Sequence, residues 1–168
     1  RSRELEELID ELTDAERASV TLSARLAGAD GLVNLALRGG SVLVGQVLDS
    51  TRSWVLVREA SGDSLVMLSA LVGAWPLGRS VARESSVRGG VGVGHVLREL
   101  CARGVDVAID SDCCDHRGII DAAYADHVDV ALSGAVVGYH GRDDQAGQTV
   151  ALAPVWFRPL LALNNISE

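Results

Sequence analysis

Residues 33–57, VNLALRGGSVLVGQVLDSTRSWVLV, decide the fold of this chain. Apolar residues at alternate positions lead into a Gly-Gly turn, and two further apolar runs follow. A period of two places side chains on the two faces of a β-strand, and the glycine pair favours a hairpin. Farther on, SGD (61–63) predicts a tight turn, and SLVMLSALVGAWPL (64–77) predicts a fourth strand, a short turn and a fifth strand. Five short strands are therefore expected.

A helix is predicted to precede these strands, over residues 4–27. Its apolar stripe follows a 3-4 spacing and comprises Leu5, Leu8, Leu12, Ala15, Ser19, Leu22 and Leu26. TDAE (13–16) matches a capping box where the helix can restart, and Gly28 or Gly31 is expected to end it. We expect the stripe to pack on its own strands, although its heptad spacing also permits a coiled-coil dimer.

The second half of the chain repeats the first. A Gly/Ser/Arg-rich linker (78–94) and a short helix, HVLRELCARG (95–104), precede the repeated strands. Gly118 aligns with Gly45 at an offset of 73, and the preceding strands align at an offset of 72, which predicts one extra residue in the second copy's first hairpin. The matching runs are VNLAL (33–37) with VDVAI (105–109), and VMLSALVGAWPL (66–77) with VALAPVWFRPL (150–160).

A helix followed by five bent strands, with Gly45 or Gly118 inside the second strand, resembles the Sm-like family of SH3-like small barrels. A glycine at a barrel corner also has a physical reason, because no Cβ obstructs the bend. The pattern is similar to two-barrel proteins of high-GC bacteria. The expected fold is mainly β with helices: two five-stranded Sm/SH3-like barrels in tandem, each preceded by an α-helix. The expected division is 1–77, a linker at 78–94, and 95–168.

The resemblance implies a place for an RNA pocket, which the family builds from an Asp-x-x-x-Asn arrangement after strand two and an Arg-Gly pair near strand five. Asp49 fills the first position, but Ser53 stands in place of the asparagine. Ala122 and Asp126 occupy these positions in the second copy, and neither copy has the Arg-Gly pair. RNA binding in the family's usual manner is therefore not predicted.

The stretch DSDCCDHRG (110–118) groups residue types that bind metals or act as nucleophiles. The repeat places it in the first hairpin of the second copy. Alternation then puts Cys113, Asp115 and Arg117 on one side of a strand, and Cys114, His116 and Gly118 on the other. Cys113 and His116 have metal-ligand spacing, but a structural zinc needs four ligands, so a polar hairpin with no metal is expected. No base or oxyanion hole can be placed beside Cys114.

Charge is unevenly distributed over the 168 residues, whose net charge is −8. Residues 105–147 contain nine aspartates and two arginines, which disfavours contact with a phosphate backbone. All fifteen basic residues are arginine, and five lie in residues 78–104. No apolar run is long enough to span a membrane, and three cysteines do not form a disulfide framework. The cytoplasm is the expected compartment.

These patterns predict a non-catalytic protein without a cofactor. The expected strand positions bring together no catalytic triad, no paired carboxylates and no set of metal ligands. We expect an adaptor or regulatory protein that binds a protein partner through its barrels, with Trp54 as an exposed anchor and with Trp75 and Trp156 in packing roles. The alternative is an RNA- or DNA-binding regulator that uses Arg79, Arg83, Arg88, Arg98 and Arg103. The barrels are expected to contact each other through strand edges, in a monomer or homodimer.

Overall fold

The computed structural model describes residues 2–82, 93–111, 115–132, 148–152 and 156–160. Its architecture is mainly β, with all strand pairs antiparallel and few helices. The first half of the chain contains α1 (Ser2–Ser19), α2 (Leu22–Ala27), β1 (Leu32–Leu37), β2 (Val42–Ser50), β3 (Trp54–Glu59), β4 (Gly62–Met67) and β5 (Leu71–Trp75). The second half contains α3 (Val93–Arg103), β6 (Asp106–Asp110), β7 (Asp115–Ala123), β8 (His127–Leu132), β9 (Gln148–Ala151) and β10 (Trp156–Leu160).

The two halves have the same strand order, as the internal repeat predicted. The first half is ordered β5-β1-β2-β3-β4, and the second is ordered β10-β6-β7-β8-β9. Single-turn helices stand at two of the predicted turns, at Arg38–Gly40 and at Leu68–Ala70. Gly39 and Gly40 have φ values of 85° and 91°, which a residue with a Cβ rarely adopts.

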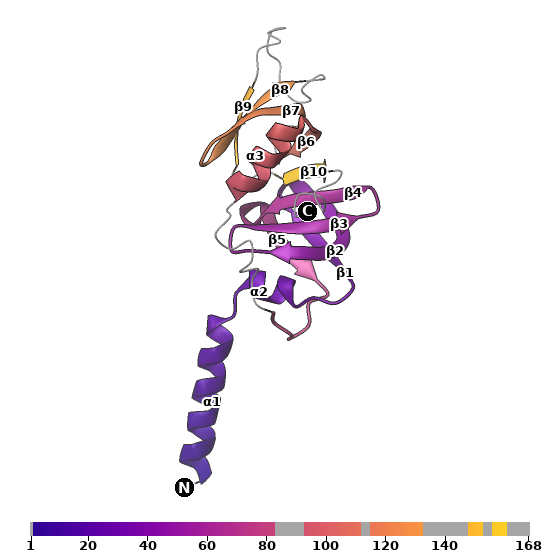
Figure 1. The fold of residues 1–168 in the computed structure, drawn as a ribbon. Helices are drawn as coiled ribbons and strands as arrows, with labels where there is room; N and C mark the ends of the chain where they lie inside the picture. The colour runs from indigo at the N-terminus through magenta and orange to yellow at the C-terminus, as the bar shows by residue number, and fades with distance from the viewer. Residues whose placement is uncertain (1, 83–92, 112–114, 133–147, 153–155, 161–168) are drawn as a thin grey trace.

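β4 and β10 join the two halves edge to edge, so that the strand order runs continuously through ten strands (Figure 1). Trp156 lies opposite Val66, and Phe157 lies opposite Leu65. The predicted contact between the halves is therefore confirmed. In the part of the chain that the structure describes, β4 pairs with β3 and β10 rather than with β5, so the halves are not two separately closed barrels.

The strand registers correct the predicted alignment of the two first hairpins. Gly45 lies opposite Val33, whereas Gly118 lies opposite Val107. The strands before the turn are therefore offset by 107 − 33 = 74 residues, not 72, and the second hairpin is one residue shorter rather than longer. Because side chains alternate with a period of two, a slip of two residues leaves the same faces buried. The burial pattern alone does not distinguish these two alignments.

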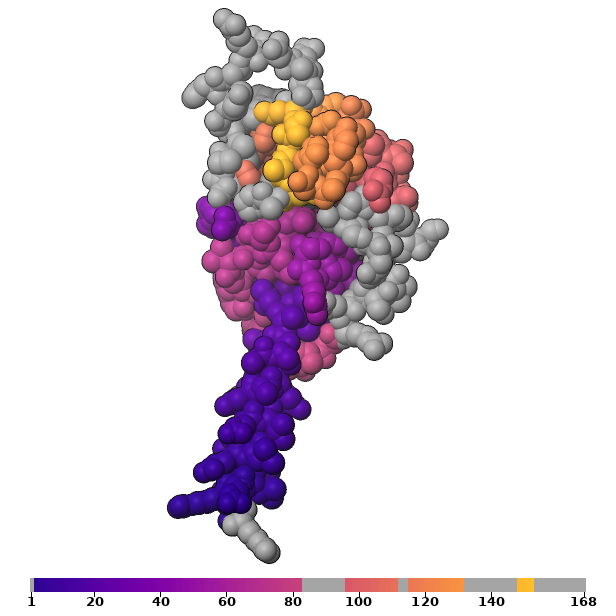
Figure 2. Space-filling view, turned by 90° about the vertical axis from the view of Figure 1, so that its left-hand side faces the viewer, coloured from indigo at the N-terminus to yellow at the C-terminus, as the bar shows by residue number. Residues whose placement is uncertain are grey.

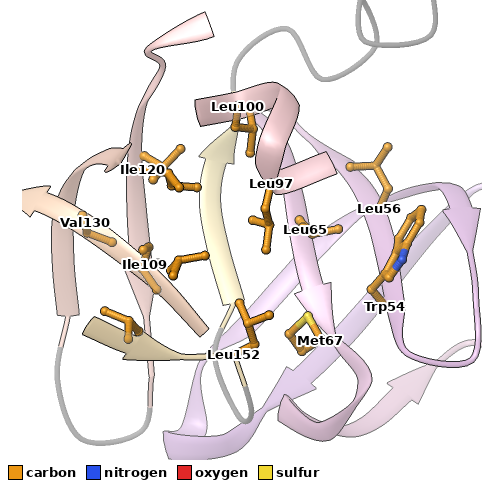
Figure 3. Packing of buried hydrophobic residues seen from close by; sticks show 13 residues of the cluster. Trp54, Leu56, Leu65, Met67, Leu97, Leu100, Ile109, Ile120, Val130 and Leu152 are labelled. Carbon is orange, nitrogen blue, oxygen red and sulfur yellow. The ribbon is translucent and has the colours of Figure 1, made fainter. Parts of the chain in front are cut away.

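Two hydrophobic cores lie on opposite faces of β3 and β4. The first core belongs to the first half alone and consists of Leu26, Val33, Leu35, Leu37, Leu43, Val55, Val57, Val66 and Ala70. The second core combines side chains from both halves (Figure 3): Trp54, Leu56, Leu65, Met67, Leu97, Leu100, Val107, Ile109, Ile120, Val128, Val130, Val150 and Leu152. The second half therefore completes its core on the first half.

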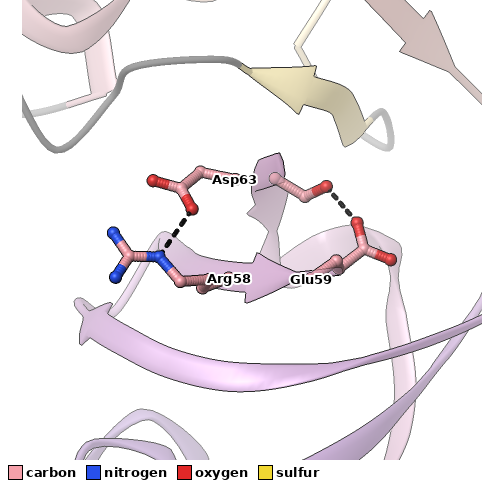
Figure 4. A network of polar contacts seen from close by, with 4 residues as sticks. Arg58, Glu59 and Asp63 are labelled. Carbon is pink, nitrogen blue, oxygen red and sulfur yellow. Dashed lines mark hydrogen bonds and ion pairs between the residues drawn. The ribbon is translucent and has the colours of Figure 1, made fainter. Parts of the chain in front are cut away.

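Two polar contacts hold the β3–β4 hairpin beside this joint (Figure 4). Arg58 Nε donates to Asp63 Oδ1 at 3.2 Å, and Ser64 Oγ donates to the carboxylate of Glu59. Asp63 is buried, and the guanidinium compensates the burial of its charge. Asp63 lies opposite Leu160, so these contacts fix the end of β4 that receives β10.

The predicted single helix is divided at Val20 and Thr21. The Thr21 hydroxyl accepts a hydrogen bond from the Ala24 amide at 3.2 Å and so caps α2. The predicted restart at TDAE (13–16) is wrong, because α1 continues through it. Gly28 caps the end of α2, as predicted.

Of the two helices in the first half, α2 alone packs on the strands, through the buried Leu26. None of the residues of α1 is buried, and Figures 1 and 2 show this helix projecting away from the body. The predicted packing of the whole stripe on its own strands is therefore wrong for its α1 portion. The physical reason is the break at Thr21, which separates the direction of α1 from that of α2.

We expect Gly45→Ala to lower the free energy of unfolding by about 1–3 kcal/mol, the usual cost of overpacking. A Cβ at Gly45 would lie 2.5 Å from the carbonyl oxygen of Arg58, an atom of the β3 backbone. Gly73→Ala is the matched control, because a Cβ there meets nothing within 4 Å. Urea denaturation measures both variants, and equal stabilities would contradict a tight β2–β3 approach at Gly45.

Candidate functional site

The side chains on the outward side of β1, β2 and β5 are mostly apolar, with Asn34 and Gln46 as polar members, and we call this surface the outer sheet face. The strand registers place Trp75, Asn34 and Val44 in one row across the three strands, with Ala36 and Val42 in the next row. Asn34 Nδ2 donates to the Trp75 carbonyl oxygen at 3.0 Å and fixes the edge of this surface. The large exposed side chains of the outer sheet face are Leu32, Val42, Val44, Val72 and Trp75.

The tryptophans of the first half have exchanged their predicted roles. Trp54 is 1% exposed and lies in the second core, so its predicted role as an exposed anchor is wrong. β3 is covered on both faces, which alternation along a single strand does not reveal. Trp75, which was expected to pack internally, is 48% exposed at the edge of the outer sheet face. Only the backbone of Trp156 is described, as part of β10.

The outer sheet face has a polar counterpart in the second half. The repeat offset of 73 places Asp115 and Arg117 at the positions of Val42 and Val44. Asp115 and Arg117 are exposed, and Arg117 pairs with Asp106 at 3.4 Å. This contrast between aligned copies is visible in the sequence, since Val42 and Val44 are apolar where the aligned Asp115 and Arg117 are charged.

α1 carries a second exposed apolar surface. Leu5, Leu8, Ile9 and Leu12 are spaced as one helical face, and each is 51–61% exposed. Residues 2–19 also contain seven acidic residues and two arginines, a net charge of −5. The surface is therefore an apolar stripe with acidic borders, and we call it the α1 stripe.

The Cys/His/Asp stretch lies partly outside the described residues, which exclude Cys113 and Cys114. Its hairpin is present as predicted, with Asp110 opposite Asp115. Asp115 is exposed and His116 is buried, which confirms the predicted alternation for these two positions. The His116 Nδ1 atom is buried and has no hydrogen-bond partner among the described residues. Within the same part of the chain, no three His, Cys, Asp or Glu side chains are grouped as metal ligands.

The five arginines of the nucleic-acid alternative are only partly described. Arg79 is exposed in the segment after β5, and Arg98 and Arg103 are exposed on α3. Arg83 and Arg88 lie outside the described residues. Arg98 and Arg103 are five positions apart, about 140° around the helix, so α3 does not present them on one face.

A small polar cluster occupies the β7–β8 turn. The rings of Tyr124 and His127 stack with centroids 4.4 Å apart, and His127 Nδ1 lies 2.7 Å from Asp126 Oδ1. The hydrogen bond with His127, and then its charge, hold the pKa of Asp126 below its ordinary value. The Asp126 carboxyl is fully exposed, so this contact orders the turn rather than forming a buried catalytic pair.

Comparison with protein-family models, curated proteins and solved structures finds no match to this chain. In the described residues, no helix has the length and apolar character needed to cross a membrane.

Proposed function

We propose that this chain is a non-catalytic adaptor of two Sm-like, SH3-like units in tandem that binds a protein partner. The repeated strand order and the glycine inside each second strand support the Sm-like assignment. The observation that carries the proposed function is the outer sheet face. Leu32 and Val72, two of its five large side chains, are 65% and 70% exposed, and several large apolar side chains exposed on one face are typical of protein interaction sites.

The outer sheet face favours a protein over a nucleic acid. Its outward side chains are apolar or uncharged. They therefore cannot neutralise phosphates and release the counterions of a nucleic acid, which is the main source of affinity in such contacts. Trp75 stands at its edge, and a partly exposed aromatic side chain beside aliphatic ones is typical of a binding hot spot. The proposed contact therefore uses apolar burial rather than charge.

Site-specific photo-cross-linking tests this function at two positions that the repeat makes equivalent. A photoreactive residue at Val44 is expected to cross-link a stoichiometric protein partner in the native lysate, whereas the same residue at Arg117 is expected to give none. The Trp75→Ala change should abolish the Val44 product. Equal labelling from both positions would contradict the proposal. So would retention of nucleic acid at physiological salt that is lost on Arg79→Ala plus Arg98→Ala.

A further inference from the structure

We propose that two copies of this chain form a closed dimer in which the α1 stripe of each copy packs across the outer sheet face of the other. The proposal rests on the proposed function, because it takes the outer sheet face to be a protein-binding surface, and it names a second copy of this chain as the protein bound there. It assigns a partner to both of the apolar surfaces that the first half leaves uncovered. Helices and sheets with one apolar face are stable when that face is buried against another element.

The two surfaces match in size. Leu5 and Leu12 bound the stripe and are seven residues apart, which corresponds to about 10 Å along a helix. The outer sheet face spans β5, β1 and β2, and three neighbouring strands cover about 10 Å. The four large side chains of the stripe therefore cross the same width as the two outward rows that begin at Trp75 and Gly73.

The charge of α1 favours the outer sheet face of the second copy, rather than the second copy's α1 helix, as the surface that covers the α1 stripe. In a parallel pair of α1 helices, Glu11 of one copy would lie beside Glu16 of the other, and each helix carries a net charge of −5. The outer sheet face has no acidic side chain among its outward residues, and Arg38 is exposed on the adjoining turn. The acidic borders of α1 therefore meet a neutral surface with a positive edge.

The direction of α1 favours binding to the outer sheet face of a second copy rather than to that of its own chain. α2 is held in place, because Arg25 donates to the carbonyl oxygens of Leu77 and Gly78 at 3.0 Å and the Ala82 amide donates to Ala24 at 3.1 Å. α1 leaves α2 pointing away from the body (Figures 1 and 2). Docking on its own sheet face would require α1 to change direction at Val20 and Thr21, because it projects away from the body in the structure. A second copy can reach α1 in the direction observed, and two identical contacts close the dimer.

Light scattering coupled to size-exclusion chromatography tests this dimer on the full chain. The unmodified chain is expected to have twice the monomer mass. Leu8→Glu plus Leu12→Glu, called the stripe variant, and Val44→Glu, called the face variant, should each be monomeric. Arg117→Glu, at the position equivalent to Val44, should remain dimeric. All of these positions are on the surface, and circular dichroism checks that each variant is folded.

Mixing the two defective variants decides which surfaces meet. The stripe variant keeps an intact outer sheet face, and the face variant keeps an intact α1, so an equimolar mixture retains one of the two contacts and is expected to form heterodimers. A face variant that is dimeric by itself would show pairing between two α1 helices and overturn the proposal. An unmodified chain that is monomeric at every concentration would also overturn it. A monomer that still cross-links a different protein from Val44 would leave the proposed function standing.

Discussion

Trp54→Ala is expected to lower the free energy of unfolding by about 3–5 kcal/mol, the range for removing a buried tryptophan. The Trp54 side chain is 1% exposed and lies in the core that the two halves share, with Leu65 of the first half and Leu97 of the second. The lost indole leaves a cavity that the surrounding strands cannot close without separating from one another. Urea denaturation followed by circular dichroism measures the change.

Trp75→Ala is the matched control for this prediction. Trp75 is 48% exposed, so its removal is expected to change stability by less than about 1 kcal/mol while it removes part of the outer sheet face. Trp54→Phe is a second control. It keeps most of the buried area and removes an indole N–H that has no partner among the described residues, so its cost should be well below that of alanine. A Trp75→Ala variant that is less stable than Trp54→Ala would contradict the assigned cores.

Leu97→Ala is expected to cost about 2–5 kcal/mol, although Leu97 lies on a helix of only eleven residues. The side chain is fully buried, and α3 joins Trp54 and Leu65 of the first half to the second half's own core. An eleven-residue helix is marginal in water by itself, so α3 depends on this packing. Loss of order should therefore extend to the strands of the second half.

Arg98→Ala, on the exposed side of the same helix, controls for helix propensity and for loss of a long side chain. Its effect is expected to lie within about 0.5 kcal/mol of zero, as is usual for surface substitutions. Differential scanning calorimetry compares the two variants. If Leu97→Ala and Arg98→Ala melt together with the unmodified chain, α3 does not occupy the shared core.

The strands were predictable from the sequence because their signals are local. The alternation of Val33, Leu35 and Leu37 marked β1 and its buried face, and the glycine pair at 39–40 marked the turn that follows. The repeat then supplied the second half, since both copies keep the same strand order. α2 ends at Gly28, one of the two glycines that the sequence offers as its stop, although the Gly28 φ of −88° is not the left-handed conformation of the usual glycine cap.

The two cores and the outer sheet face were not predictable in the same way. Alternation separates the two faces of a strand but does not reveal when both are covered, and β3 is such a strand. The sequence therefore predicts Trp54 on the surface, whereas the structure buries it. The apolar spacing does not indicate the break at Thr21, because this spacing continues across it, from Ser19 to Leu22. Comparing Val42 and Val44 with Asp115 and Arg117 would have found the exposed apolar surface.

Backbone nuclear Overhauser effects between β4 and β10 test most directly whether the two repeats form one continuous sheet. Cross-strand contacts are expected between Val66 and Trp156 and between Leu65 and Phe157, and the β4 amides that face β10 should exchange as slowly as those of β3. If these contacts are absent and the same β4 amides exchange with solvent as those of an open edge strand do, the two halves are separate and the shared core is wrong.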